Sequence, residues 1–163
     1  MPKLITLSPE VTASLGFTHK VVITALEVGA MTNATAYSVI PQKSAAGVWA
    51  MVATAAPAAT LPAGTCVKQV SVRVTTAFVG DTPTFTIGDG GAVARYLASI
   101  SFAAATFKIQ TLLMPFTYAV ADTIDIIPTQ SANLAALSAG EVEIYLELRD
   151  LDVLSRPTIL ANV

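Results

Sequence analysis

Charged residues are scarce in this chain of 163 residues. Asp, Glu, Lys and Arg make up 12% of the sequence, whereas roughly 25% is usual in a soluble domain, and 53% of the residues are hydrophobic. The mean hydropathy is +0.65. Because so little polar surface is available, we expect either a membrane or another protein surface to cover the apolar excess.

The sequence also lacks an apolar run long enough for a transmembrane helix, which needs about 20 residues without helix breakers. Its longest uncharged stretch, residues 44–67, is dominated by Ala and Thr and contains Gly47, Pro57, Pro62 and Gly64. Ala and Thr contribute little to membrane insertion. The first ten residues lack the apolar run of a secretory signal. We therefore expect no membrane partner and synthesis in a cytoplasm.

One cysteine and one histidine limit the possible chemistry. Cys66 alone excludes an intrachain disulfide and any metal site built from several cysteines, and we expect it to be a small buried side chain. His19 would have to serve any Ser-His-Asp or Cys-His arrangement, and no Gly-x-Ser-x-Gly turn accompanies it. We expect His19 at a surface or edge position, and we predict no catalytic residues.

Basic and aromatic residues are too few for two common classes of binding protein. Nine Lys and Arg residues face eleven Asp and Glu residues, which gives a formal charge of -2. The basic residues are scattered from Lys3 to Arg156, so no nucleic-acid partner is expected. Aromatic residues make up 7% of the chain, and we expect the single tryptophan, Trp49, in the core or an interface.

Alternation of apolar and polar residues is the dominant pattern, and it predicts β-strands. The clearest strand spans residues 70–78, and the turn residues 80–83 lead from it to residues 84–87, which predicts a hairpin. In residues 141–149 one face is apolar, and the opposite face must be solvated or salt-bridged. The predicted inward residues are Val70, Val72, Val74, Thr76, Phe78, Phe85, Ile87, Val142, Ile144, Leu146 and Leu148.

Further strands are predicted at residues 19–28, 34–40, 48–54, 106–114 and 123–128, with helical turns at 92–105 and 131–139. Seven or more short strands separated by turn residues are typical of an all-β fold. We therefore expect a single β-sandwich or jelly-roll-like domain over residues 17–149.

The two ends of the chain are apolar but contain Pro2, Pro9 and Pro157. A disordered tail would be more polar, so these ends are expected to pack either on their own domain or on a neighbouring subunit. Because proline disfavours helices and interior strands, we expect an N-terminal arm at residues 1–16 and a C-terminal arm at residues 150–163.

Three groups of residues have the composition of a binding or catalytic site but not its spacing. The loop at residues 88–91 has no following Lys-Ser/Thr, so we interpret it as a tight turn with glycines at positive φ. Four aspartates near strand ends match no calcium loop, and three glutamates on one strand face suit glycoside hydrolysis less well than a solvated face. No cofactor or metal ligand is predicted. The residues considered are Gly88, Asp89, Gly90, Gly91, Asp81, Asp122, Asp125, Glu141, Glu143 and Glu147.

Residues 67–148 resemble the β-rich structural proteins encoded among the head genes of tailed bacteriophages. The resemblance lies in five stretches, at residues 70–81, 83–91, 95–98, 121–129 and 139–148. It implies a capsid decoration (cement) protein that sits on the outside of the shell and bridges subunits of the major capsid protein. It brings no catalytic residues with it.

Composition and resemblance together predict the partners of this chain. Low charge and apolar ends favour a homo-oligomer, and the resemblance implies a trimer in contact with the major capsid protein. The expected location is the capsid exterior of a virion, after synthesis in the host cytoplasm. A head fibre or tail protein is an alternative, and a carbohydrate-binding or adhesive module is a more distant one.

Overall fold

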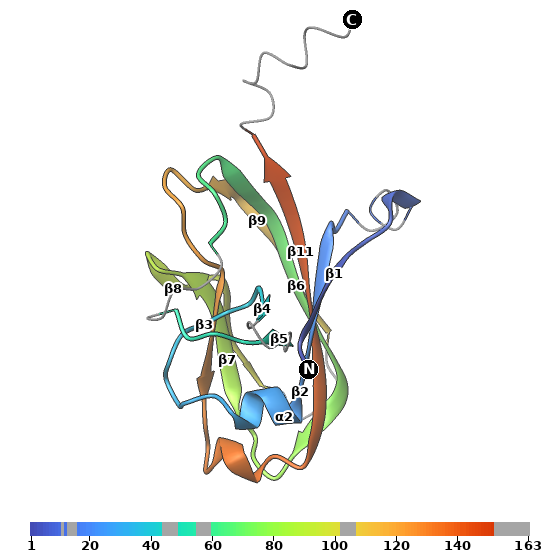
Figure 1. Cartoon of the computed structure of the whole chain (residues 1–163), viewed down its shortest axis with the longest axis vertical. Coiled ribbons are helices and arrows are strands. Elements are labelled where there is room, and N and C mark those ends of the chain that lie inside the picture. Colours follow the sequence, from blue (N-terminus) through green and yellow to red (C-terminus); the bar gives the residue numbers. More distant parts are fainter. Residues whose placement is uncertain (11, 13–15, 44–48, 55–59, 102–106, 152–163) are drawn as a thin grey trace, which may run out of the picture.

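The computed structural model describes residues 1–10, 12, 16–43, 49–54, 60–101 and 107–151, which form two antiparallel sheets and a small hairpin (Figure 1). The five-stranded sheet has the order β1 (Lys3–Thr6), β2 (His19–Thr24), β11 (Ala139–Asp150), β6 (Thr65–Val79), β9 (Phe107–Thr117). The four-stranded sheet has the order β3 (Tyr37–Ser38), β10 (Asp125–Thr129), β7 (Thr84–Asp89), β8 (Ala92–Ser101). The hairpin pairs β4 (Gln42–Lys43) with β5 (Trp49–Ala50). The all-β prediction is confirmed.

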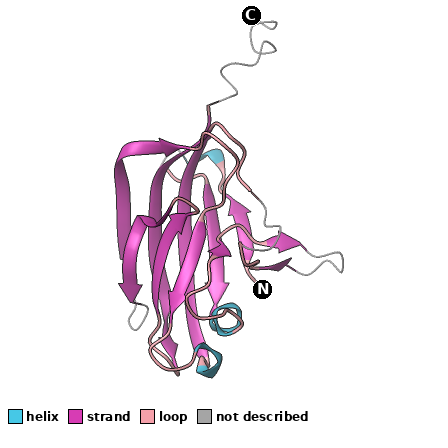
Figure 2. Ribbon diagram, turned by 90° about the vertical axis from the view of Figure 1, so that its left-hand side faces the viewer, coloured by secondary structure: helices cyan, strands magenta, loops and turns pink. Residues whose placement is uncertain are grey.

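Both sheets contribute side chains to a single buried core. On β11, Val142, Ile144 and Leu146 are fully buried, and on β7 the same holds for Ile87. The alternation in the sequence therefore predicted these inward faces, with Thr76 as an exposed exception on β6. Figure 2 shows the strands running lengthwise, with short helical segments at both ends.

The predicted hairpin between residues 70–78 and 84–87 is wrong, because β6 and β7 lie in different sheets. The turn between them packs on the segment before β11. Asp81 accepts hydrogen bonds from the hydroxyl of Ser131 and from the backbone N–H of Ala132. A Cβ atom on Gly80, whose φ is +106°, would lie 2.0 Å from the carbonyl oxygen of Ala136. The chain passes from one sheet to the other at this turn, and these contacts hold the turn in place.

Several predicted strand boundaries also need correction. The strand predicted at residues 19–28 ends at Thr24, because Thr24 and Glu27 form a capping box that starts helix α2 (Ala25–Gly29). Of the described residues within 34–40 and 48–54, only two in each range belong to a strand, in β3 and β5. Residues 92–101 form β8 and not a helical turn. The helical turn predicted within residues 131–139 is confirmed as the 3-10 helix η1 (Leu134–Ala136).

Part of the N-terminal end at residues 1–16 packs on its own domain, which is one of the two alternatives expected for it. Strand β1 pairs antiparallel with β2, from Lys3 opposite Val22 to Thr6 opposite His19. The backbone N–H of Leu7 continues this pairing with the carbonyl oxygen of Thr18. The prolines flank this strand and do not interrupt it, which is why they do not prevent pairing.

The predicted C-terminal arm at residues 150–163 lies almost wholly outside the described residues. Its first residue, Asp150, is the last residue of β11 and pairs with Thr65. The backbone N–H of Leu151 donates to the carbonyl oxygen of Gly64. The chain therefore remains paired with β6 up to Asp150, and Leu151 is bonded to the residue just before β6.

Candidate interaction surfaces

The outer face of the five-stranded sheet is built from paired charges. Glu143 on β11 accepts a hydrogen bond from Lys20 at 2.9 Å and another from the hydroxyl of Tyr145 at 2.6 Å, and Arg73 lies 4.0 Å away. Partial burial acts to raise the pKa of Glu143, but the hydrogen bonds from Tyr145 and Lys20 outweigh it and hold the pKa below its usual value. Burial and Glu143 raise the pKa of Tyr145 to about 12.

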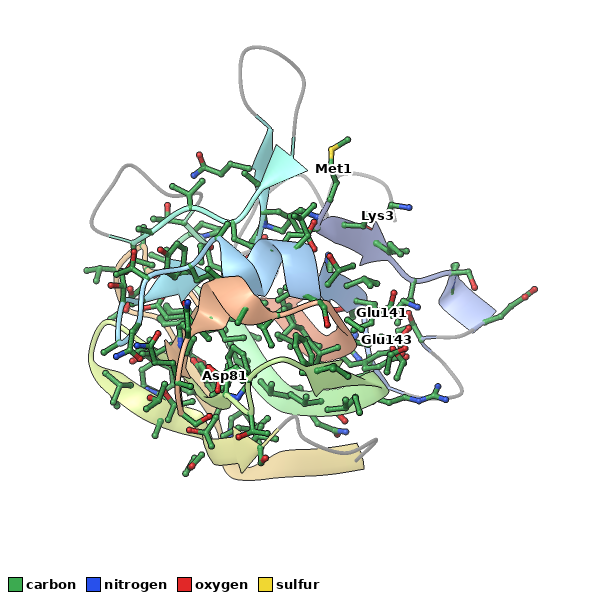
Figure 3. All side chains as sticks on the ribbon, turned by 90° about the horizontal axis from the view of Figure 1, so that it is seen from below. Met1, Lys3, Asp81, Glu141 and Glu143 are labelled. Carbon is green, nitrogen blue, oxygen red and sulfur yellow. The ribbon has the colours of Figure 1, made fainter. Side chains whose placement is uncertain are left out.

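The other two glutamates on this face are also held by partners. Glu147 pairs with Lys68 at 2.9 Å and with Arg149 at 3.2 Å, and Glu141 accepts a hydrogen bond from the hydroxyl of Thr75 at 2.7 Å. The structure thus brings the three glutamates to one face, as their spacing predicts, and that face is salt-bridged. Figure 3 shows Glu141 and Glu143 beside each other, away from Asp81.

A second polar cluster lies beside the β7–β8 turn and is buried. Asp89 accepts hydrogen bonds from the backbone N–H groups of Gly91 and Ala92, from Nε of Arg95 and from the hydroxyl of Tyr96. The hydroxyls of Tyr96 and Tyr118 are 2.7 Å apart, and Tyr118 donates to the carbonyl oxygen of Thr123. Burial raises the pKa of both tyrosines, so each hydroxyl keeps its proton at neutral pH. The cluster is therefore a set of neutral and paired groups.

Three of the four aspartates considered from the sequence interact with this cluster. Asp89, Asp122 and Asp125 all act electrostatically on Tyr118, whereas Asp81 binds Ser131 elsewhere. Burial, with a contribution from the other two carboxylates, raises the pKa of Asp125, and its Oδ1 atom has no hydrogen-bond partner among the described residues. Over the described part of the chain, no three His, Cys, Asp or Glu side chains are arranged to hold a metal ion.

The loop at residues 88–91 is a tight turn, as predicted, but positive φ is not the reason for its glycines. The glycines at positive φ among the described residues are Gly16, Gly64, Gly80 and Gly140. Gly88 is required by close approach, because a Cβ atom there would lie 2.1 Å from the carbonyl oxygen of Ala92.

His19 and Cys66 do not come together. His19 lies on β2 and Cys66 on β6, and β11 runs between these two strands. The Nδ1 atom of His19 lies 2.8 Å from the hydroxyl oxygen of Thr18, and burial lowers the pKa of His19. Cys66 is buried, as predicted, and His19 is half-buried at the start of β2, which is not an edge strand because β1 pairs with it. The side chain of Trp49 is outside the described part.

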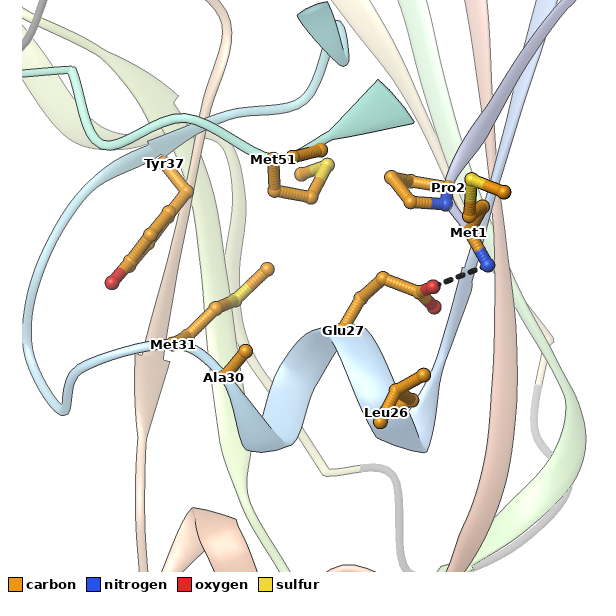
Figure 4. A pocket seen from close by; sticks show the side chains of 9 residues that line it. Met1, Pro2, Leu26, Glu27, Ala30, Met31, Tyr37 and Met51 are labelled. Carbon is orange, nitrogen blue, oxygen red and sulfur yellow. Dashed lines mark ion pairs between the residues drawn. The ribbon is translucent and has the colours of Figure 1, made fainter. Parts of the chain in front are cut away.

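Two apolar cavities open to the surface. The methionine cavity, of about 250 Å³, is lined by Met1, Pro2, Leu26, Glu27, Ala30, Met31, Tyr37, Ala50 and Met51 (Figure 4). The end cavity, of about 280 Å³, is lined by His19, Ile40, Leu61, Thr65, Leu146, Leu148, Arg149 and Asp150. In the methionine cavity the amino group of Met1 pairs with Glu27 at 2.6 Å.

Large apolar side chains also remain exposed on the described surface. Leu26 is 78% exposed, Val120 is 71% exposed and Met1 is 66% exposed, and Leu26 and Met1 both belong to the lining of the methionine cavity. The others are Ile5, Val79, Val93 and Leu151. The exposed apolar surface thus consists of the methionine cavity and of several single side chains outside it.

Sequence reasoning missed the partners that define the two polar clusters. Lys20, Arg95, Tyr96 and Tyr118 had no role assigned to them, although each lies in or beside a predicted strand or turn. Opposite charges on neighbouring strands are a general signal for such pairs, but the signal is useful only when the strand order is known.

The comparisons with known proteins do not place this chain in a family. No family model, no curated protein and no solved structure matches it. Among the described residues, no helix has the length and apolar character needed to cross a membrane.

Proposed function

We propose that this chain is a non-enzymatic structural protein of a tailed-bacteriophage virion, which decorates the capsid exterior and binds the lattice of the major capsid protein. Its two sheets then form a single β-sandwich with a jelly-roll-like arrangement. The resemblance over residues 67–148 supports the virion assignment.

The observation that carries the assembly part of the proposal is the exposed apolar surface on a domain of low charge. Only 12% of the residues are charged, yet Leu26 and Val120 expose more than two thirds of their surface. A partner surface that covers these side chains would remove them from water, which is favourable by roughly 25 cal/mol per Å². Repeated contacts in a shell would provide this burial on every copy.

The polar clusters support a structural role over an enzymatic one. Glu143 and Glu147 on the outer sheet face are each neutralised by a lysine, and the carboxylate of Asp89 is occupied by Arg95 and Tyr96. Groups held by such pairs stabilise the arrangement of strands. Catalysis needs a nucleophile or base that is free to reach a substrate.

The proposal is tested by adding the purified chain to virus particles that lack it. We expect saturable binding, seen as co-sedimentation and as added density on the outside of the shell by electron microscopy. Density on a fibre or tail would support the alternative virion assignments, and the absence of binding to any particle would contradict the proposal.

A set of surface variants sharpens this test. Leu26→Ser, Val79→Ser, Val93→Ser and Val120→Ser each remove one exposed apolar side chain, and the exposed position Ala94→Ser serves as a matched control. We expect at least one of the four to weaken particle binding by tenfold or more without a change in melting temperature. Equal binding by all four and the control would exclude an interface at these positions.

A further inference from the structure

The end of the domain at which α2 and η1 lie is poor in charge. We call it the helical end surface, and it is formed by residues 24–34, 79–82 and 130–139. These residues include no Lys, Arg or His, and Glu27 and Asp81 are their only acidic residues. Figure 3 looks onto this end, with α2 and η1 beside each other near the centre.

Both carboxylates of the helical end surface are held within the chain. The side chain of Glu27 is 9% exposed and accepts a hydrogen bond from the backbone N–H of Thr24 at 2.7 Å. Asp81 is 5% exposed and accepts hydrogen bonds from the backbone N–H of Thr82 at 2.7 Å and from the hydroxyl of Ser131. The described residues of this surface therefore present no strongly exposed charge to a partner.

The side chains that this surface does expose are apolar. Leu26 on α2 is 78% exposed, and Val79 at the end of β6 is 55% exposed. The exposed alanines of the same segments are Ala30, Ala132, Ala135, Ala136 and Ala139. Covering Leu26 and Val79 with another apolar surface would remove both from water, which is favourable.

The three segments of the helical end surface are packed together. The backbone N–H of Ser138 donates to the carbonyl oxygen of Val79 at 2.9 Å. A Cβ atom on Gly29 would lie 3.2 Å from the carbonyl oxygen of Leu134, which shows how closely α2 approaches η1. The surface is therefore one fixed unit, and a partner that binds it has little additional chain to order.

Polar groups on this surface already have hydrogen-bond partners. The side-chain oxygen of Asn133 accepts from the backbone N–H of Ala135 at 3.0 Å, and the hydroxyls of Thr82 and Ser131 are 3.0 Å apart. Burying a polar group is costly mainly when it loses its partners. These four residues can therefore be covered by an apolar partner at low cost.

The lack of charge indicates which kind of partner fits. A charged surface would lose its hydration against the helical end surface without meeting an opposite charge, which is unfavourable. The same surface on a second copy of the chain is uncharged and apolar, so it matches. Other faces of the described chain are charged, with Lys20 and Glu143 on the outer sheet face and Arg149 and Asp150 at the opposite end.

We propose that the helical end surface is the contact between copies of this chain, with the same surface of each copy facing one symmetry axis. Contact through a charged face would bring like charges together around that axis, whereas this surface avoids such repulsion. Either two or three copies can meet in this way. The inference does not rest on the proposed virion function, because it concerns the purified chain alone.

A charge placed on this surface should separate the copies. Val79→Glu and Ala135→Glu each add one carboxylate at an exposed position, and like charges then meet across the axis. We expect the dissociation constant, measured by light scattering over a concentration series, to rise by about tenfold or more. Val93→Glu is the matched control, because Val93 is 59% exposed but lies beside the β7–β8 turn, and it should leave association unchanged.

Mixing variants of opposite charge tests whether the partner is a second copy. Ala135→Glu and Ala135→Lys should each be folded by circular dichroism and associate weakly. Their mixture should associate about tenfold more tightly than either alone, because each carboxylate then meets an ammonium group. A misfolded variant would not recover in this way.

Four results would overturn the proposal. They are a monomeric unmodified chain, unchanged association of the Val79 and Ala135 variants, an equal loss from Val93→Glu, and no recovery of association in the mixture. None of these measurements uses virus particles, so failure here is distinct from failure of the virion proposal.

Discussion

The hydroxyl of Tyr96 lies 2.7 Å from the hydroxyl of Tyr118, and this contact joins the two sheets. Tyr96 is on β8 of the four-stranded sheet, and Tyr118 directly follows β9 of the five-stranded sheet. Arg95 adds a second link, because its guanidinium group lies 3.8 Å from the ring centre of Phe116 on β9. A pair of buried hydroxyls thus fixes the relative position of two sheets at the β7–β8 turn.

Removing one of these hydroxyls should destabilise the fold. Tyr118→Phe leaves the buried hydroxyl of Tyr96 without one of its partners, and we expect a loss of about 1–3 kcal/mol in the free energy of unfolding by denaturant. The double variant with Tyr96→Phe should lose less than the sum of the single losses, because the two groups interact directly. Tyr37→Phe is the control, since its hydroxyl accepts an exposed hydrogen bond from the backbone of Thr32. Equal effects at Tyr37 and Tyr118 would contradict the role of the buried pair.

Asp125 should make stability depend on pH. Burial raises the pKa of Asp125 in the folded protein, so the charged carboxylate is unfavourable there. The contribution of Asp125 to stability therefore decreases as the pH rises from the pKa of the unfolded chain towards the pKa of the folded protein. Asp125→Asn should therefore stabilise the fold at pH 7, and this gain should disappear below about pH 4, as measured by denaturant unfolding.

Asp81 should change the stability of the fold with pH in the direction opposite to Asp125. The hydrogen bond from Ser131 lowers its pKa, so its charge stabilises the fold above the unfolded pKa and this contribution is lost as pH falls towards the folded value. Asp81→Asn should destabilise the fold at pH 7. If both aspartate variants shifted stability in the same direction, the assigned environment of one of them would be wrong.

The two faces of β11 should respond differently to substitution. Ile144→Asp places an unpaired charge in the core, where Ile144 is fully buried, and we expect loss of cooperative unfolding. Glu143→Ala removes a half-buried ion pair with Lys20, which should cost about 1 kcal/mol or less. Circular dichroism and thermal unfolding measure both, and similar melting temperatures would show that the faces are assigned wrongly.

Gly88 should tolerate no side chain, whereas the neighbouring Gly90 should. A Cβ atom on Gly88 would meet the carbonyl oxygen of Ala92 at 2.1 Å, so Gly88→Ala must displace the β7–β8 backbone. On Gly90 the nearest atom is a carboxylate oxygen of Asp122 at 3.1 Å, which can move. We expect a loss of more than about 2 kcal/mol for the first variant and less than about 1 kcal/mol for the second. A larger loss from Gly90→Ala would contradict this packing.

The purified chain should form a homo-oligomer, with a trimer as the state implied by the resemblance. Exposed apolar side chains on a domain of low charge favour association, because association removes them from water. Light scattering at micromolar concentration measures the mass. A mass near 16.9 kDa, which is that of one chain, would contradict the prediction.

The sequence by itself determined that the fold is mostly β and which way the side chains of its clearest strands face, because side chains alternate along a strand whatever its partner is. Val142, Ile144 and Leu146 were assigned to the core in this way, and the opposite face of β11 to water or salt bridges. The 3-10 turn at residues 134–136 also followed from the local sequence.

Only the tertiary structure decided which strands are neighbours. The turn residues 80–83 suit a hairpin and a crossing between sheets equally well. The hydrogen bonds that Asp81 accepts from Ser131 and Ala132 favour the crossing. The pairing of Tyr96 with Tyr118 likewise depends on bringing two sheets together. Alternation reports the direction of each side chain, whereas neighbours are set by contacts between residues far apart in the chain, and these contacts leave no period in the sequence.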